Sequence, residues 1–317
     1  MSSSVDVPLV ILGATASGKS ALALEVARLA GDVEIVSVDS MQVYRGMDIG
    51  TAKPSSGEQA EICHHLLDLC DPEEEFSVAL YQSAARAALA SIRARGKRAV
   101  LVGGTGLYLR AIVDELEMPA QYPEARASIE GTPDTNALYQ RLLELDPIAA
   151  ARIEPSNRRR LVRALEVTIG SGRPFSSYGP GLTAYPAVPF HLVGIQRDRA
   201  DLDRRIALRY EQQMGQGFLQ EVARLAERRE GLSVTAGYAL GYRELIEVVR
   251  GVRSLPEALE QARTRTRRFA RRQQRWFRRD SRIRWRAATD NSVADAATLL
   301  ADWSKWGGDT WSAEQCG

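Results

Sequence analysis

The sequence predicts an α/β fold, with a parallel-sheet core into which an all-helical domain is inserted. Short apolar runs alternate with helix-length segments, which is the βαβ rhythm of a parallel sheet. The strands are expected at residues 7–12, 33–38, 99–102 and 191–195. The helices between them are expected at residues 18–30, 77–95 and 201–214.

A change of pattern in the middle of the chain predicts the inserted domain. Between residues 118 and 189, amphipathic helices replace the strands, near 135–144, 147–152 and 157–169. We therefore expect the core to comprise residues 1–117 and 190–317, and the helical domain to comprise residues 118–189.

The last third of the chain is predicted to be mostly helical. Helices should continue to about Arg279, and RIRWR at residues 282–286 should form a short strand. One helix is expected after Ser292, followed by a loose tail that contains Trp303, Trp306 and Trp311.

The first loop, residues 13–20, has the GxxxxGK[ST] spacing of a phosphate-binding P-loop. It reads GATASGKS and lies between a predicted strand and a predicted helix, the context that this motif requires. Lys19 should contact the terminal phosphates, and Ser20 should bind Mg²⁺. Backbone N–H groups should surround the phosphate oxygens along Gly13, Ala14, Thr15, Ala16, Ser17 and Gly18. The alternative is a glycine-rich turn without a ligand.

Two further strand ends carry polar residues. Asp39 follows the second strand, and Thr105 follows the third, in the sequence GGTGLY. Proteins that hydrolyse nucleotides usually place an acidic residue after such a later strand, and this chain does not. Because the carboxyl ends of parallel strands face one crevice, Asp39, Thr105 and the P-loop should converge there. The alternative for Asp39 is a helix-capping or surface role.

Length and composition are those of a soluble enzyme. The chain has 317 residues, enough for a sizeable core, and three cysteines, which do not suggest a disulfide framework. No apolar run reaches the length of a membrane span, and the first residues lack the basic region of a signal peptide. We expect a cytoplasmic monomer. Cys63, His64, His65 and Cys70 lack zinc-site spacing, so we expect a loop beside the active site there.

Charge is concentrated in one segment. Residues 263–286 contain twelve arginines and one acid, Asp280, giving +11, while the whole chain carries +2 and the remainder therefore −9. Phe269, Trp276 and Phe277 should turn one face of a long helix toward the core and leave the arginines outward. Clustered arginine is typical of RNA contact, although a solvated helix face is the simpler alternative.

These motifs together resemble the tRNA dimethylallyltransferase family, also called tRNA isopentenyltransferases. The resemblance spans roughly Val7 to Trp285. It is carried by GATASGKS, VSVDSMQVYRGMDIGTAKP, CHHLLD, LVGGTGLYLRA, RRLVRALEV, GYALGYREL and RRFARRQQRWFRR. The family moves the dimethylallyl group of dimethylallyl diphosphate to N6 of the adenosine at tRNA position 37, in the anticodon stem-loop, and releases pyrophosphate. The resemblance implies that the P-loop holds a diphosphate and not ATP.

The resemblance and the chemistry together assign roles to residues. Asp39 would orient N6 and take its proton, while Thr105 and Lys19 would act on the departing diphosphate, helped by Arg205 or Arg209. The residues implied to contact tRNA are Ser40, Met41, Gln42, Arg159, Arg160, Arg163, Arg243, Arg268 and Arg272. For Arg160 and Arg163, an ion pair with Glu166 is an equal alternative.

Two other functions remain open at this point. A transferase that modifies free adenylate would share the P-loop, Asp39 and Thr105, but would have little use for the inserted domain and the basic segment. A P-loop RNA-binding switch driven by ATP would need hydrolysis machinery, which the GGTGLY strand end does not supply.

Overall fold

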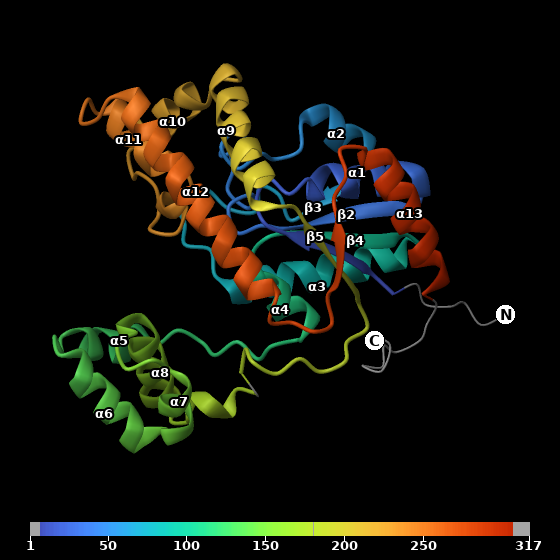
Figure 1. Cartoon of the computed structure of the whole chain (residues 1–317). Helices are drawn as coiled ribbons and strands as arrows, with labels where there is room; N and C mark the ends of the chain where they lie inside the picture. Colours follow the sequence, from blue (N-terminus) through green and yellow to red (C-terminus); the bar gives the residue numbers. More distant parts are fainter. Residues whose placement is uncertain (1–6, 180, 307–317) are drawn as a thin grey trace. The chain divides into compact units, whose positions relative to one another are not determined.

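The computed structural model describes residues 7–179 and 181–306, which form two compact units (Figure 1). Unit 2 spans Asp114–Pro186, and unit 1 comprises the chain on either side of it. The insert expected from the sequence, residues 118–189, is displaced by a few residues from unit 2. No helix in the described part of the chain combines the length and apolar character needed to cross a membrane.

Unit 1 is built on a six-stranded, all-parallel sheet, which confirms the predicted α/β class. The strand order is β3-β2-β4-β1-β5-β6. The strands are β1 (Leu9–Gly13), β2 (Val33–Val38), β3 (His64–His65), β4 (Arg98–Gly103), β5 (His191–Gln196) and β6 (Arg284–Ala287). The outer strand β3 lies where a loop was expected. Two residues are too few to show a strand pattern in the sequence.

Both faces of the sheet are covered, as expected for parallel strands. Alternate residues of β1 show this: Val10 and Leu12 pack with one core cluster, and Leu9 and Ile11 pack with another. The second cluster is covered by α1 (Lys19–Ala30) and α13 (Ser292–Lys305) (Figure 1). The first lies under α3 (Val78–Ala94) and α4 (Gly106–Val113). A short helix, α2 (Ser56–Glu61), precedes β3.

Two of the tryptophans expected in a loose tail belong to helix α13 or its end, so that expectation was wrong. Trp303 is buried, its Nε1 donates to the carbonyl of Val7 at 2.9 Å, and the Arg98 guanidinium lies over its ring. Trp306 ends the helix with the Arg284 guanidinium over its ring. Trp311 lies outside the described residues.

Four helices of unit 1 pack together beside the sheet (Figure 1). They are α9 (Arg199–Gly215), α10 (Phe218–Ala226), α11 (Tyr242–Val249) and α12 (Leu255–Phe277). The arginine-rich helix is α12, which starts at a Ser254–Glu257 capping box. Its buried face consists mainly of small residues and differs from the predicted aromatic stripe: Phe277 is buried, but Phe269 lies half-exposed beneath Arg272.

Unit 2 is all-helical, with a small core of its own. Its helices are α5 (Pro123–Glu130), α6 (Thr135–Leu145), α7 (Pro147–Arg152) and α8 (Arg158–Ser171). The buried residues include Ile129, Leu138, Leu142, Leu161 and Leu165. Each lies on the inner face of its helix, at the three- and four-residue spacing that the sequence shows.

Candidate active site

The P-loop has the backbone geometry of an anion-binding turn. Ala16 and Gly18 both have left-handed φ angles, 63° and 94°. Gly18 caps α1, and the amide of Leu22 donates back to its carbonyl at 3.0 Å. Gly18 tolerates this left-handed conformation because glycine has no Cβ. Such alternating conformations direct successive N–H groups into one concave surface at the start of a helix, where the positive end of the helix dipole adds to them.

Lys19 lies close to two other charged residues of the site. Its Nζ donates to the carbonyl of Ala14 at 3.2 Å. Burial lowers the pKa of Lys19 to about 8, while the charge of Asp39 raises it and the charge of Arg209 lowers it further. Burial also lowers the pKa of Arg209, and Asp39 again acts in the opposite direction. Lys19 and Asp39 therefore lie at the same end of the sheet, as the strand ends predict, and Arg209 reaches this end from α9.

Asp39 and Thr105 meet between β2 and β4. The hydroxyl of Thr105 accepts from the amide of Ser40 at 3.1 Å, and the amide of Thr105 donates to the carbonyl of Val38 at 3.3 Å. The Oδ1 oxygen of Asp39 accepts from the amide of Met41 at 2.9 Å. This bond holds one oxygen of the carboxylate within its own loop.

The residues that follow Asp39 are fixed by bonds within the protein. Gln42 accepts from the Ser37 hydroxyl at 2.7 Å and donates to the carbonyls of Thr51 and Ala52. Met41 packs at the edge of the core. Gln42 therefore shapes the loop, a role that was not predicted from the sequence.

A buried glutamate from α10 holds the far part of this loop. Glu221 accepts from the amides of Asp48, Ile49 and Gly50 at 2.8–3.2 Å, and from the Tyr242 hydroxyl at 2.6 Å. Gln213 of α9 donates to the carbonyl of Ile49 at 2.6 Å. The loop's backbone is therefore satisfied by side chains that were not predicted, since no local motif marks them.

A glutamine of the arginine-rich helix joins the P-loop to the Thr105 loop. The Oε1 of Gln273 accepts from the amide of Thr15 at 2.8 Å, and its Nε2 donates to the carbonyl of Gly104 at 2.8 Å. A Cβ at position 104 would lie 2.3 Å from that Nε2, so only glycine allows the approach. Gln273 is buried and is an uncharged member of a basic run, the one signal that could have indicated its inward role.

Of the two arginines predicted to bind phosphate from α9, Arg209 reaches the P-loop. Its Nη1 donates to the Thr15 hydroxyl at 3.1 Å. Arg205 instead lies 3.8 Å from Asp290 and lines a separate pocket of about 360 Å³ with Ser17 and Gly18. Arg197, which was not predicted, is almost buried and donates to the carbonyl of Ser17 at 3.0 Å, bracing the loop from behind.

Two stacked tyrosines lie near Asp39. The rings of Tyr81 and Tyr108 are 4.2 Å apart, and the Tyr81 hydroxyl donates to the carbonyl of Ser37 at 2.7 Å. Burial raises the pKa of both tyrosines, with the Asp39 charge contributing, so both stay neutral beside the carboxylate.

The arginines expected to contact tRNA fall into two groups. Arg159, Arg160, Arg243, Arg268 and Arg272 are exposed. Arg163 is not free: it pairs with the buried Glu166 at 2.5 Å and donates to the carbonyl of Pro119 at 2.7 Å. The alternative weighed for Arg163 is therefore the geometry observed, and no such pair joins Arg160 to Glu166 among the described side chains.

Comparisons with known proteins agree on one family. A model described as IPP transferase matches residues 42–280, and one described as isopentenyl transferase matches residues 7–69. The chain is 43% identical over 297 residues to the tRNA dimethylallyltransferase of Bifidobacterium longum subsp. infantis, covering 92% of this chain and 89% of that protein. The crystal structure of a tRNA isopentenylpyrophosphate transferase from Bacillus halodurans has a TM-score of 0.67 at 33% identity, covering 95% and 99% of the two chains. A eukaryotic dimethylallyltransferase, crystallised acting on tRNA, has a TM-score of 0.75 at 26% identity, covering 93% of this chain and 77% of that one.

Proposed function

Because this chain belongs to the IPP transferase family, we propose that it transfers the dimethylallyl group of dimethylallyl diphosphate to N6 of adenosine 37 in tRNA. The matches over most of the chain confirm the family resemblance seen in the sequence, and with it a transferase that modifies tRNA. The observation that carries the proposal is geometric: Arg209 bonds to Thr15 of the P-loop, and Gln273 joins this loop to the strand end where Thr105 meets the loop of Asp39. This arrangement supports a site in which an anion cradle would lie beside a carboxylate base.

The cradle would hold the diphosphate. The P-loop amides, Lys19 and Arg209 offer positive charge that is already oriented before the substrate arrives. Charge on the bridging oxygen grows as the bond to the allylic carbon breaks, so these donors stabilise the transition state more than the bound substrate. Thr105 can turn its hydroxyl toward the same oxygens.

The donors present fit Mg²⁺. Ser20 is the second residue of α1, is exposed, and offers a hydroxyl, an oxygen donor of the hard type that Mg²⁺ accepts. The P-loop contributes no carboxylate, so substrate phosphates and water would supply the remaining ligands. When bound, the ion would neutralise diphosphate charge.

Asp39 would act on the acceptor, the N6 amine of adenosine 37. The lone pair of N6 attacks the allylic carbon, the carbon–oxygen bond breaks, and diphosphate leaves with the bonding electrons. The new C–N bond makes N6 acidic, and the second carboxylate oxygen of Asp39 accepts its proton. A positioned base of this kind contributes about 10²- to 10⁴-fold to the rate.

The tRNA would be held through its backbone. Exposed arginines on α12 and α8, with Arg243, offer charge to phosphates of the anticodon stem-loop. Adenosine 37 must leave the stack for its N6 to reach Asp39, as in other enzymes that act on a base. We propose that one chain carries out this reaction in the cytoplasm.

A free-adenylate isopentenyltransferase is the second candidate. The isopentenyl transferase match at residues 7–69 is compatible with it, but this segment contains the P-loop and Asp39, which both candidates share. The all-helical unit and the basic helix α12 argue for a large acceptor instead.

One experiment separates the candidates. The protein is incubated with labelled dimethylallyl diphosphate and Mg²⁺, with AMP in one tube and unmodified tRNA in another. Label in tRNA alone supports the proposal, and label in AMP alone supports the second candidate. If neither acceptor is labelled, and a parallel assay shows that RNA stimulates ATP hydrolysis, the result would support the P-loop RNA-binding switch.

A further inference from the structure

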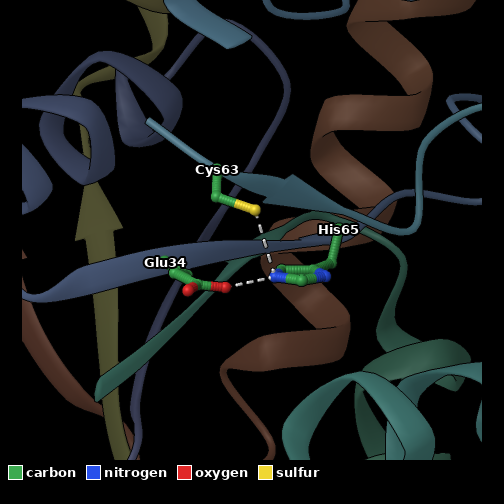
Figure 2. A group of neighbouring side chains, drawn as sticks. All are labelled: Glu34, Cys63 and His65. Carbon is green, nitrogen blue, oxygen red and sulfur yellow. Dashed lines mark hydrogen bonds and ion pairs between the residues drawn. The ribbon is translucent and has the colours of Figure 1, made fainter. Parts of the chain in front are cut away.

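A glutamate, a cysteine and a histidine converge at the outer edge of the sheet, away from the residues of the proposed reaction. Figure 2 shows Glu34 on β2 facing Cys63 and His65 at β3. The Nε2 of His65 lies 2.6 Å from Oε2 of Glu34 and 3.5 Å from Sγ of Cys63. Ligand atoms of the three residues all lie within 4.8 Å of one another.

The sheet fixes this arrangement. The amide of Ile35 donates to the carbonyl of Cys63 at 2.9 Å, and Val36 is paired with His65. Residues two apart on a strand point to the same side, so Cys63 and His65 face the same way. His64 points to the other side, where its Nδ1 lies 2.7 Å from the carbonyl of Ile62.

The chemistry of the three groups matches a particular cation. One ring nitrogen carries at most one proton, so Nε2 of His65 cannot donate to both of its neighbours. A thiolate, an imidazole and a carboxylate form a set of ligands typical of Zn²⁺, which takes four ligands in a tetrahedral arrangement.

We propose that Glu34, Cys63 and His65 bind Zn²⁺, with water as the fourth ligand. The Cys63 thiol gives up its proton to solvent when the ion binds. Oxygen donors alone would favour Mg²⁺ instead, so this site and the active site select different ions.

Arg95 has two effects on this site. Its Nε lies 3.2 Å from Oε1 of Glu34 and orients the carboxylate, as hydrogen-bonded partners of metal ligands do. Its Nη2 lies 2.5 Å from Oε2, the oxygen that faces His65, and therefore competes with a cation. Removing this guanidinium should tighten Zn²⁺ binding.

The ion would stabilise the outer strand. Only two residues of β3 pair with β2, and Zn²⁺ would add a link between the two strands. Glu34 lies five residues before Asp39, about 16 Å along an extended strand, so the link does not touch the reacting groups.

Calorimetric titration of the chelator-treated full chain with ZnCl₂ tests the site. We expect one Zn²⁺ per chain, a Kd weakened at least ~10-fold by Cys63→Ser or His65→Gln, and a rise in Tm with Zn²⁺ that Cys63→Ser abolishes. Cys70→Ser and His64→Gln are matched controls and should bind like the wild type. Absence of stoichiometric binding, or equal affinity in Cys63→Ser, would overturn the proposal.

Two further measurements test the site without replacing any of its three ligands. Zn²⁺ should slow alkylation of Cys63 in the wild-type protein, measured by mass spectrometry of the labelled peptide. Arg95→Gln should bind Zn²⁺ several-fold more tightly. Unchanged alkylation of Cys63 at saturating Zn²⁺ would contradict the assigned ligands, and weaker binding by Arg95→Gln would contradict the competing role of this guanidinium.

Discussion

The proposed active site has a diphosphate side, at the P-loop, and an acceptor side, at Asp39, and these two sides are built in different ways. The diphosphate side is a contiguous turn, residues 13–20, whose left-handed residues and lysine lie next to one another in the chain. The acceptor side is a long loop that begins at Asp39 and is held by Glu221 and Gln213, more than 160 residues further on. One side is therefore a local motif, and the other depends on tertiary packing.

The largest effect should come from removing the glutamate that holds the acceptor loop. Glu221→Ala leaves three backbone amides and the buried Tyr242 hydroxyl without their acceptor, so we expect the free energy of unfolding to fall by about 3 kcal/mol or more. Urea unfolding measures this change. Glu227→Ala, at the exposed end of the same helix, should change stability by less than about 0.5 kcal/mol. Equal effects would refute the bracing role.

Asp39→Asn should impair the acceptor side and leave the diphosphate side intact. The amide keeps the shape of the carboxylate but cannot take a proton, so the chemical step should slow by at least ~10²-fold. Affinity for dimethylallyl diphosphate should hardly change, since the P-loop is intact. Single-turnover kinetics and equilibrium binding give the two numbers. An unaltered chemical step would remove Asp39 from the base role.

Gln273→Ala should disturb both sides at once. It removes the bonds to Thr15 and Gly104, each contributing about 1 kcal/mol, so we expect a loss of roughly 10-fold in kcat/KM. Gln274→Ala, its half-buried neighbour, is the control. Gln273→Glu can still accept from Thr15 but cannot donate to Gly104, so it shows which bond matters. A normal Gln273→Ala enzyme would mean that the two loops keep their positions without this bridge.

The diphosphate side should respond to pH through Lys19. Burial lowers its pKa to about 8, and a bound diphosphate favours the charged ammonium, so binding takes up a proton above that pH. Affinity for dimethylallyl diphosphate should therefore fall as pH rises from 8 to 9.5, by up to about tenfold per unit. Lys19→Arg keeps its charge and should give a flat profile. A similar fall in Lys19→Arg would assign the titration to another group.

The smallest effect is expected on the outer face of α12. Replacing Arg268 and Arg272 with glutamine should weaken tRNA binding at every sequence and flatten the salt dependence of log K by about 0.7–0.9 for each phosphate that is no longer neutralised. Diphosphate affinity should stay the same. Arg86→Gln with Arg93→Gln, two exposed arginines of α3, is the matched control. An unchanged salt slope would favour a merely solvated face.

The difference between the two sides also explains what the sequence could predict. The P-loop, Asp39 and Thr105 were identifiable because each follows an apolar strand, and parallel strands bring their ends together. Glu221 and Gln213 were not, because their partners are mainly backbone groups of a distant loop, which leave no pattern in the sequence. The sequence marks Gln273 only as an uncharged residue in a basic run, which does not identify its partners.

Two further cases show the same limit of prediction from the sequence. Glu34 precedes Cys63 by nearly thirty residues, so spacing alone could not join it to the cysteine and histidine. The sequence also could not choose between Arg205 and Arg209, because i, i+4 neighbours on one helix can face different partners.

The strand order also sets when this protein can fold during its own synthesis. β1 pairs with β4 and with β5, whose first residue is His191, and β6 at the far edge begins at Arg284. The first strand can pair with β4 early, but its second partner, β5, is made only after the whole of unit 2. Unit 2 is contiguous and has its own core, so it can become compact first. A growing chain would thus carry a folded unit 2 while the sheet of unit 1 is still incomplete. During that interval the apolar strands that precede unit 2 would be exposed and would be targets for chaperones.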